Sequence, residues 1–149
     1  MIKIKRGLDL PLSGAPKQAI SRSPAVRSVA IVGADYPGLQ PTMQVAEGDS
    51  VRCGQILFSD KKNAQVVFTA PASGRVRAVN RGARRVFLSL VIDIDPTIDD
   101  VEKFTAHSVD ALSSLSAEAV NEQLRVSGLW TALRTRPFSK VPVPGTTPS

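Results

Sequence analysis

The sequence has few of the side chains that most often do chemistry. Among 149 residues there is one cysteine, one histidine, one tryptophan and one tyrosine. The lone Cys53 excludes an internal disulfide, and its place beside Gly54 favours a small strand-edge residue over a reactive thiol. His107 has no second histidine and no nearby cysteine, which argues against zinc and Ser-His-Asp sites and favours a surface histidine. We therefore expect no catalytic residue and no metal site.

Long apolar runs and phosphate-binding glycine patterns are also missing. The longest nearly apolar run, Val86 to Ile92, has seven residues, far short of the roughly 20 that a membrane-spanning helix needs. Basic residues near the N-terminus are not followed by the apolar stretch of a secretory signal. Neither G-x-G-x-x-G nor G-x-x-x-x-G-K-S/T occurs. The sequence thus predicts a cytosolic protein without a transmembrane segment, a nucleotide cradle or a bound cofactor of its own.

Acidic residues are absent from one long stretch of a chain whose formal net charge is +6. Seven basic residues and no acid lie between Lys61 and Ile92, and five acids follow from Asp93 to Glu102. This segregation is typical of faces that meet oppositely charged partners or an anionic membrane surface. Solvated strand edges, protected from aggregation by Arg and Lys, explain it equally well. The acidic stretch lacks the central glycine of an EF-hand and is expected to be a solvated turn.

A pair of β phrases dominates the middle of the chain. One is V-x-x-G-D-x-V-x-x-G-Q-x-L, over 45–57, and the other is A-P-x-x-G-x-V, over 70–76. Gly48-Asp49 favours a positive-φ turn, and Pro71 with Gly74 predicts a second reversal. The residues expected to face inward on the short strands are Val45, Val51, Ile56, Phe58, Val67, Phe68 and Val76. The pattern resembles the barrel-sandwich hybrid of biotinyl and lipoyl carrier domains, in which two similar halves fold together.

The remaining elements follow from periodicity and turn residues. A helix is expected over 117–127, because Ser116 is suited to cap it and Gly128 to end it. We predict a mainly β domain over 1–103, followed over 104–149 by one short helix, an extended arm and a linker tail. The other expected elements are an edge strand at Ile2–Ile4, a buried strand at Val29–Val32, a turn at Asp35–Gly38, and a hairpin pairing 76–79 with 86–94 around a basic tip.

The arm from Trp130 to Lys140 is the most unusual segment. It combines two large aromatic residues with three cations, and no acid follows Glu122. A contact surface for a second domain, a partner subunit or a flat aromatic ligand such as a quinone would explain this composition. Packing back onto the β domain would explain it equally well. The candidate contact residues are Trp130, Arg134, Arg136, Phe138 and Lys140.

Two other functions are consistent with a small β domain. Carrier domains attach biotin or lipoate to a lysine at the hairpin tip between their halves, and Lys61 and Lys62 occupy that interval. Their flanks, Asp60 and Asn63-Ala64, match neither the biotinyl nor the lipoyl pattern, so a shared scaffold without the modification is favoured.

The arginines of the basic hairpin could hold nucleic-acid phosphates, but only Phe87 offers a stacking platform nearby, so no nucleic acid is expected.

Several longer blocks together carry a more specific resemblance. They are MIKIKRGLDLPLSGAP at the start, Arg52-Cys-Gly-Gln55, Asp60-Lys-Lys-Asn63, Phe68-Thr-Ala-Pro-Ala72, Val79-Asn-Arg-Gly-Ala83, and GLWTALRTRPFSKVP over 128–142. The chain thereby resembles the A subunits of the sodium-translocating NADH:quinone oxidoreductases over almost its whole length. The related C subunit of the Rnf electron-transport complex shares the barrel-sandwich start, but it uses cysteine clusters that this sequence lacks. Because the A-subunit family continues into a Rossmann-like region, we expect an N-terminal fragment.

The resemblance implies a bacterial, peripheral subunit on the cytoplasmic side of the inner membrane. Its partners would be the other subunits of a sodium-pumping NADH:ubiquinone reductase, which carry the flavins and an iron-sulfur centre. Members of this family are associated with quinone binding rather than NADH chemistry. The resemblance therefore implies a non-catalytic accessory subunit that docks to membrane subunits and contributes to a ubiquinone site.

Overall fold

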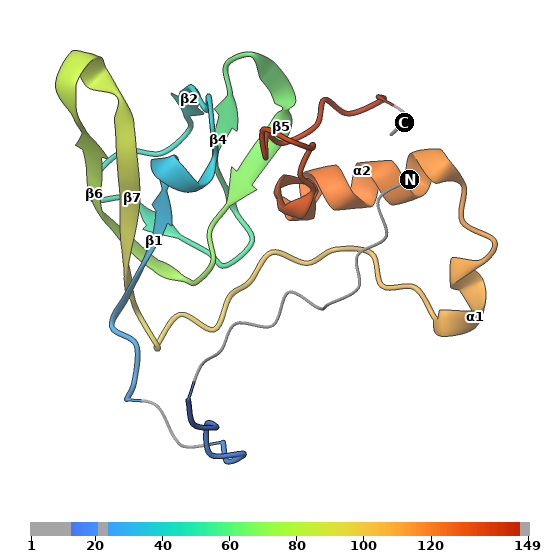
Figure 1. The fold of residues 1–149 in the computed structure, drawn as a ribbon, viewed down its shortest axis with the longest axis horizontal. Helices are drawn as coiled ribbons and strands as arrows, with labels where there is room; N and C mark the ends of the chain where they lie inside the picture. The colour runs from blue at the N-terminus through green and yellow to red at the C-terminus, as the bar shows by residue number, and fades with distance from the viewer. Residues whose placement is uncertain (1–12, 21–23, 147–149) are drawn as a thin grey trace.

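The computed structural model describes residues 13–20 and 24–146 and has a mainly β architecture, with a helix and an extended C-terminal segment beside the strands (Figure 1). The strand expected at Ile2–Ile4 lies outside these residues. The strands are β1 (Ser28–Val32), β2 (Pro41–Met43), β3 (Ser50–Val51), β4 (Ile56–Asp60), β5 (Asn63–Thr69), β6 (Gly74–Arg81) and β7 (Phe87–Ile94). The helices are α1 (Val109–Leu112) and α2 (Ala117–Val126), with 3₁₀ turns η1 (Gly33–Asp35), η2 (Ala83–Arg85) and η3 (Leu129–Ala132).

The strands form two antiparallel sheets that pack against each other. One sheet has the order β1-β7-β6-β3 and the other has the order β2-β4-β5. Phe58 of β4 contacts Phe87 of β7 across the interface, with 5.3 Å between ring centroids. Phe58 also stacks on Phe68 of β5, with centroids 4.7 Å apart. Aromatic contacts thus run from one sheet into the other, and the predicted barrel-sandwich hybrid is confirmed.

The two β phrases of the sequence are joined by reciprocal backbone hydrogen bonds. The amide of Gly48 donates to the carbonyl of Val76, and the amide of Val76 donates to Asp49, both at 2.8 Å. A second reciprocal pair, also at 2.8 Å, joins Gly54-Gln55 to Ala70. The turn expected at Gly48 forms with φ of 92°. The phrases therefore hold each other in register through these backbone contacts.

Glycine is required at position 74 for a different reason from the predicted one. The sequence suggested that it frees the backbone for a turn, but Gly74 lies in β6, and its φ is not among the positive values. A Cβ added there would overlap the carbonyl oxygen of Asp93 on the neighbouring β7. Glycine is therefore required because two backbones approach closely, and the prediction of a glycine-dependent turn at this position was wrong.

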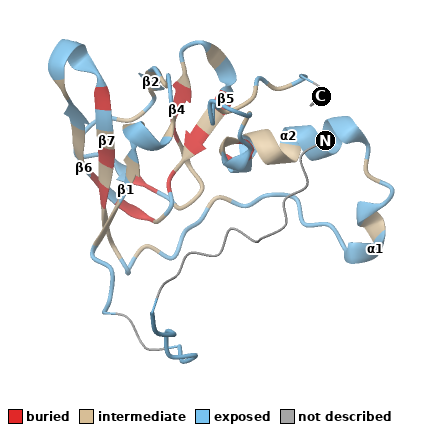
Figure 2. Ribbon diagram, viewed as in Figure 1, coloured by how far each residue is buried: buried red, intermediate tan, exposed pale blue. Residues whose placement is uncertain are grey.

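The core lies between the sheets (Figure 2), and three of the seven residues expected to face inward, Val45, Ile56 and Val67, are only half-buried. Val66 and Leu57 are 3% and 0% exposed, whereas the expected Val67 and Ile56 are only half-buried. In β5, alternation places Val66 on the same face as Phe68 and turns Val67 to the other face. Strand β4 lies between two neighbours in its sheet and has a register shift between residues 56 and 58, so adjacent residues are buried.

Strand β1 forms over almost the expected residues but is not a buried strand. Among the described strands it pairs only with β7, at the edge of its sheet, and no residue from 28 to 32 is fully buried. An edge strand has one neighbour and leaves more of its surface in water. The predicted hairpin with a basic tip is confirmed: β6 pairs with β7, and η2 forms the tip.

The helix expected over 117–127 is confirmed as α2, and a single turn, α1, precedes it. The Ser116 hydroxyl accepts a hydrogen bond from the amide of Ala119 at 3.2 Å, which caps the first turn of α2. Gly128 follows the helix with φ of 77°. The chain then turns through η3 and returns along β5, so the predicted extended C-terminal arm lies against the β domain (Figure 1).

Candidate functional site: the arm and the pocket beneath it

Trp130 anchors the C-terminal arm to the core. In the structure this arm extends beyond the predicted Trp130 to Lys140 segment and comprises residues 129–143. The Trp130 side chain is 7% exposed and belongs to the same hydrophobic cluster as Phe58 and Phe68. The indole Nε1 donates a hydrogen bond to the carbonyl oxygen of Pro142 at 2.9 Å. The sequence left two explanations open for the arm. The burial of Trp130 agrees with the second, in which the arm packs back onto the β domain.

Arg134 lies on the outside of this anchor. Its guanidinium carbon is 4.5 Å from the centroid of the Tyr36 ring, a cation–π geometry. Tyr36 in turn meets Phe68 edge-on, with centroids 4.8 Å apart. The arm is therefore held to the loop between β1 and β2 as well as to β5.

Beyond Arg134 the arm closes into a small loop that presents an exposed aromatic residue. The amide of Thr135 donates to the carbonyl of Lys140, and the amide of Ser139 donates to the carbonyl of Thr135, both at 2.8 Å. Phe138 is 71% exposed, and the Lys140 Nζ is 5.9 Å from its ring centroid. Arg136 is exposed on the same loop. The loop therefore offers cations and an aromatic ring to a partner.

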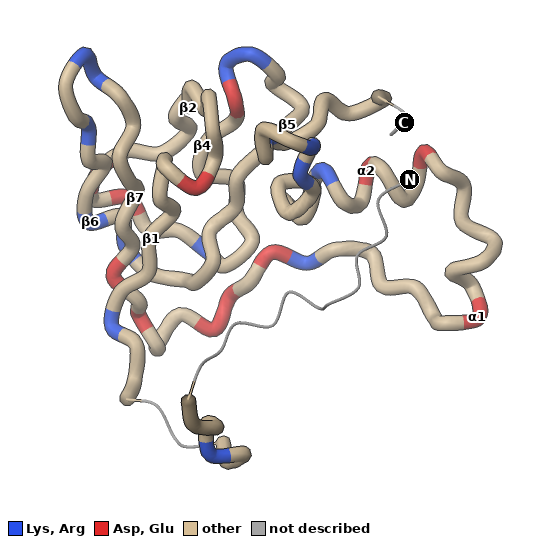
Figure 3. Tube along the Cα trace, in the orientation of Figure 1, with Lys and Arg blue, Asp and Glu red and all other residues tan. Residues whose placement is uncertain are grey.

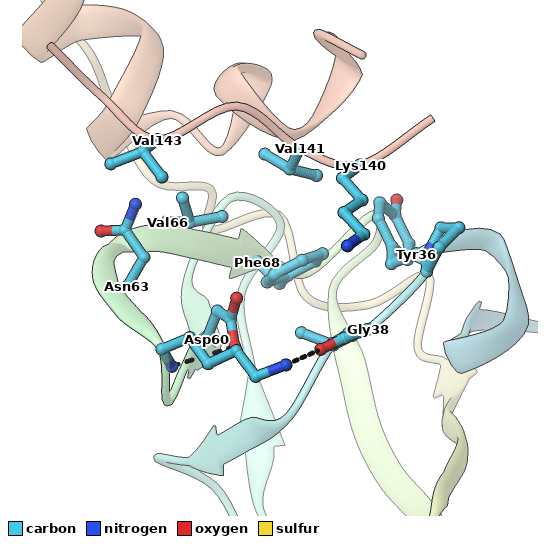
Figure 4. Close-up of a pocket in the computed structure, with 12 residues that line it drawn as sticks. Tyr36, Gly38, Asp60, Asn63, Val66, Phe68, Lys140, Val141 and Val143 are labelled. Carbon is cyan, nitrogen blue, oxygen red and sulfur yellow. Dashed lines mark hydrogen bonds between the residues drawn. The ribbon is translucent and has the colours of Figure 1, made fainter. Parts of the chain in front are cut away.

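A pocket of about 190 Å³ lies beneath the end of the arm (Figure 4). Val141 and Val143 from the arm cover one side of it, while Val66 and Phe68 of β5 form its apolar floor. Polar groups come from the β4–β5 hairpin and from the arm itself. The complete lining is Tyr36, Pro37, Gly38, Leu39, Asp60, Lys62, Asn63, Val66, Phe68, Lys140, Val141 and Val143.

The polar edge of the pocket is held mainly by backbone contacts. Asp60 Oδ1 accepts hydrogen bonds from the amides of Gln40 at 3.3 Å and Lys62 at 3.2 Å. Lys62 Nζ donates to the carbonyl oxygen of Gly38 at 3.3 Å. The Nδ2 of Asn63 is buried and has no hydrogen-bond partner within the described part of the chain. An apolar floor with a few fixed polar groups is the composition typical of small-molecule sites.

The structure brings together only part of the predicted site. Lys140 lines the pocket, and Arg134 stacks on Tyr36, which also lines it. Arg136 and Phe138 lie on the exposed loop of the arm, and Trp130 is buried in the core. Whether these five residues contact a quinone or a partner stays a prediction. Sequence reasoning missed Tyr36 as a site residue, although its position between Asp35 and Pro37 in an expected turn marked it as an aromatic residue on a loop.

The other candidates from the sequence lie apart from this pocket or at its rim. Lys61 and Lys62 form the tip between β4 and β5, which is the position expected for a carrier lysine. His107 is exposed, as predicted. Over 13–20 and 24–146, no group of three potential metal ligands comes together. Instead, Arg52 pairs with Asp100 at 3.2 Å and with Glu102 at 3.0 Å in the acidic stretch.

Two carboxyl groups outside the core have pKa values that differ from the ordinary ones. Hydrogen bonds from the hydroxyl and amide of Thr97 lower the pKa of Asp95 below its ordinary value of 3.8. Hydrogen bonds from its own backbone amide and from the Ser116 hydroxyl lower the pKa of Glu118 below 4.5. Both shifts favour the charged carboxylate and belong to local turn and cap structure, so neither marks a catalytic acid.

The fold and the site together define a class. Two antiparallel sheets joined by reciprocal half-units, with a basic and aromatic arm folded over one side, form a barrel-sandwich hybrid domain with a C-terminal arm. In the part of the chain that the structure describes, no helix is long and apolar enough to cross a membrane.

Comparison with known families agrees with this class and narrows it. The family model for the NqrA N-terminal barrel-sandwich hybrid domain matches residues 2–95, and the model for the NqrA second alpha/beta domain matches residues 115–149. The chain therefore belongs to the NqrA family. The boundary predicted near residue 103 falls between the two matched regions and stays a prediction.

Curated relatives are similar over the whole of this chain. It is 58% identical over 149 residues to the A subunit of the Na(+)-translocating NADH-quinone reductase from Pseudomonas aeruginosa. Identity to the subunits of the same name is 57% in Klebsiella pneumoniae and 55% in Alcanivorax borkumensis. The match covers 100% of this chain and 33% of each relative. The chain thus spans about a third of the length of the relatives it matches.

Proposed function

We propose that this chain forms the N-terminal part of an accessory subunit of a sodium-translocating NADH:quinone reductase. The observation that carries the proposal is identity of 55–58% to subunits of that name, over the whole of this chain. In this proposal the chain supplies no catalytic residue. It lies peripherally on the cytoplasmic side of the bacterial inner membrane, and partner subunits hold the flavins and the iron-sulfur centre.

Docking to those partners is assigned to the exposed loop of the arm. Phe138 and Arg136 protrude from a loop whose own backbone is tied by hydrogen bonds, so little conformational entropy is lost on binding. Exposed aromatic residues and arginine are enriched at interface centres. A partner surface with an apolar pocket and nearby carboxylates would complement this loop.

The test of docking uses the complete subunit within the complete enzyme. Phe138→Ala should reduce co-purification of this subunit with the others, because the ring contributes to the interface and not to the core. The matched control is Leu112→Ala on α1, which also removes an exposed apolar side chain but lies outside the arm. Equal co-purification of both variants with the partners would contradict the docking role of the arm.

A contribution to ubiquinone binding is assigned to the pocket beneath the arm. Its floor of Val66 and Phe68, the neighbouring Tyr36 ring and the buried amide of Asn63 fit a flat ligand with carbonyl oxygens. In the complete enzyme, a photoreactive quinone should label peptides that line this pocket. Val143→Trp, which places a large ring at the pocket, should decrease that labelling. Unchanged labelling, or labelling confined to other regions, would refute this assignment.

The carrier and nucleic-acid alternatives each have a separate test. Intact mass of the chain from cells should show no biotin or lipoate, because the residues flanking Lys61 and Lys62 match neither modification pattern. A gel shift with nucleic acid should likewise show no salt-sensitive complex. Added mass located on either lysine would replace the proposal with the carrier function.

A further inference from the structure

The tip of the β6–β7 hairpin, residues 81–88, carries an unusual concentration of charge of one sign. We call these residues the basic tip. Within them lie Arg81, Arg84 and Arg85, all exposed, and no Asp or Glu. Figures 1 and 3 show this tip projecting from the sheets, at a distance from the C-terminal arm. Its contacts are therefore separate from the docking loop and pocket described above.

The three arginines of the basic tip lack acidic partners within the described parts of the chain. Elsewhere in the same hairpin, Arg77 pairs with Asp93 at 3.1 Å. Among the residues that the structure describes, the only hydrogen bond from a guanidinium of the tip runs from Arg81 Nη1 to the carbonyl oxygen of Arg85, at 3.4 Å. The positive charge of the basic tip is thus left for an external partner.

The backbone of the basic tip is held in a costly conformation. Arg84 and Arg85 have φ of 54° and 61°, and both lie in the left-handed region that residues with a side chain rarely adopt. A hydrogen bond of 2.8 Å from the amide of Gly82 to the carbonyl of Val86 closes the turn. Neither arginine fills the core, so packing does not account for two consecutive arginines here. Strained backbone at an exposed position is often associated with function.

Exposed aliphatic side chains accompany these charges. Val86 is 59% exposed and Leu88 is 48% exposed, while Phe87 between them is buried in the core. Strand alternation fixes this arrangement, because the residues on either side of an inward Phe87 must face outward. The basic tip therefore offers cations and aliphatic groups together.

We propose that the basic tip is a contact site for an anionic phospholipid surface. Guanidinium groups are attracted to acidic headgroups, and aliphatic groups beside them enter the boundary between headgroups and acyl chains. A small free anion would satisfy the arginines but leave Val86 and Leu88 in water. This inference takes from the proposed function only the location of the chain at a membrane. It requires neither quinone binding nor docking through the arm.

The first experiment measures co-sedimentation of the 149-residue chain with vesicles. Vesicles of phosphatidylglycerol and phosphatidylcholine should bind the chain at low salt, and vesicles of phosphatidylcholine alone should not. Each basic residue near an anionic surface strengthens binding about fivefold, so the pair Arg84→Gln and Arg85→Gln should weaken it about 25-fold. Val86→Ser with Leu88→Ser should also weaken binding, and this loss should persist at low salt.

The matched control removes the same charge from another hairpin tip. Lys61→Gln with Lys62→Gln also neutralises two exposed cations, at the β4–β5 tip, and should change vesicle binding less than threefold. Circular dichroism of each variant should match the parent chain, which excludes loss of the fold. Equal weakening by both pairs would show that net charge alone acts, and absence of binding by the parent chain would also overturn the proposal.

A second experiment separates this inference from the proposed function. In the complete enzyme, the Arg84→Gln and Arg85→Gln pair should leave co-purification with the partner subunits unchanged. Loss of co-purification with unchanged vesicle binding would assign the basic tip to a protein partner and would overturn the lipid contact. Failure of the Phe138→Ala test would instead affect only the docking role of the arm.

Discussion

Gly128 joins helix α2 to the arm and is constrained in two ways. Its φ is 77°, and an added Cβ would lie 2.5 Å from the Thr69 hydroxyl oxygen on β5. That hydroxyl donates a hydrogen bond to the carbonyl of Ser127 at 3.2 Å. The helix end and the sheet therefore approach each other at a point where only glycine meets both requirements.

Gly128→Ala should destabilise the fold by roughly 2–5 kcal/mol, as the sum of left-handed backbone strain and overpacking. Gly145→Ala is the control, because Gly145 has φ of 86° but nothing within 4 Å of an added Cβ. It should cost only the backbone part, about 1–2 kcal/mol. Urea unfolding followed by circular dichroism measures both. Equal losses in the two variants would argue that contact with Thr69 is unimportant, whereas Thr69→Ala should partly rescue Gly128→Ala.

Asp95 gives a prediction about pH at the same scale. Hydrogen bonds from Thr97 favour the folded-state carboxylate, so its pKa lies below the 3.8 of the unfolded chain. A lowered pKa contributes stability above pH 3.8 that is lost as the pH falls through the lower, folded-state value. Thr97→Ala should raise the pKa of Asp95 towards 3.8. An NMR titration of the side-chain carboxyl carbon measures this, and an unchanged pKa would show that the Thr97 hydroxyl is not the cause.

Among the elements, the arm has an inner and an outer part with different purposes. Trp130 belongs to the core and is held by the carbonyl of Pro142, whereas Phe138 is mostly in water. Similar aromatic residues eight positions apart therefore have opposite energetic roles. Composition made both of them candidate contact residues and left packing onto the β domain as an equal alternative.

Trp130→Ala should cost about 3–5 kcal/mol of unfolding free energy, because it empties a buried site in the core. Phe138→Ala is the matched comparison and should change stability by less than about 0.5 kcal/mol. Denaturant unfolding measures the difference, and limited proteolysis of the arm reports its release in the Trp130 variant. A small effect of Trp130→Ala would mean that the arm is held mainly by Arg134 and its neighbours.

At the scale of the molecule, a single hydrophobic cluster among residues 13–20 and 24–146 includes strands from both sheets and Trp130 of the arm. Leu124 of α2 and Val141 of the arm pack against the same cluster. The predicted β domain over 1–103 is therefore covered on one side by residues that follow it in sequence. Burial of this kind makes the C-terminal part a contributor to the stability of the β domain.

A chain ending at Lys103 should keep its β circular dichroism but unfold at lower denaturant concentration than the 149-residue chain. The expected loss is at least the roughly 3–5 kcal/mol assigned to Trp130, because the other contacts are removed with it. The Trp130→Ala variant of the longer chain serves as the reference. Equal midpoints for the shortened and full chains would show that residues 1–103 are energetically independent of the rest.

Much of the architecture can be predicted from local sequence, because it depends on interactions between residues that are close together in the chain. The Gly48-Asp49 turn, the Ser116 cap and the hairpin around 81–86 depend on backbone preferences and short-range hydrogen bonds, and all three form where predicted. The resemblance to the quinone reductase subunits also follows from sequence, since it rests on ordered blocks of residues. The family match confirms it.

Contacts between segments far apart in the chain are decided only by tertiary structure. The pocket requires Tyr36, the β4–β5 hairpin and Val141 to meet, and no local spacing encodes that meeting. Gly74 is glycine because of Asp93 on another strand, and Trp130 is buried because α2 and η3 return along β5. Periodicity tells which residues prefer the interior, but packing geometry decides which of them enter it and which remain on the surface for a partner.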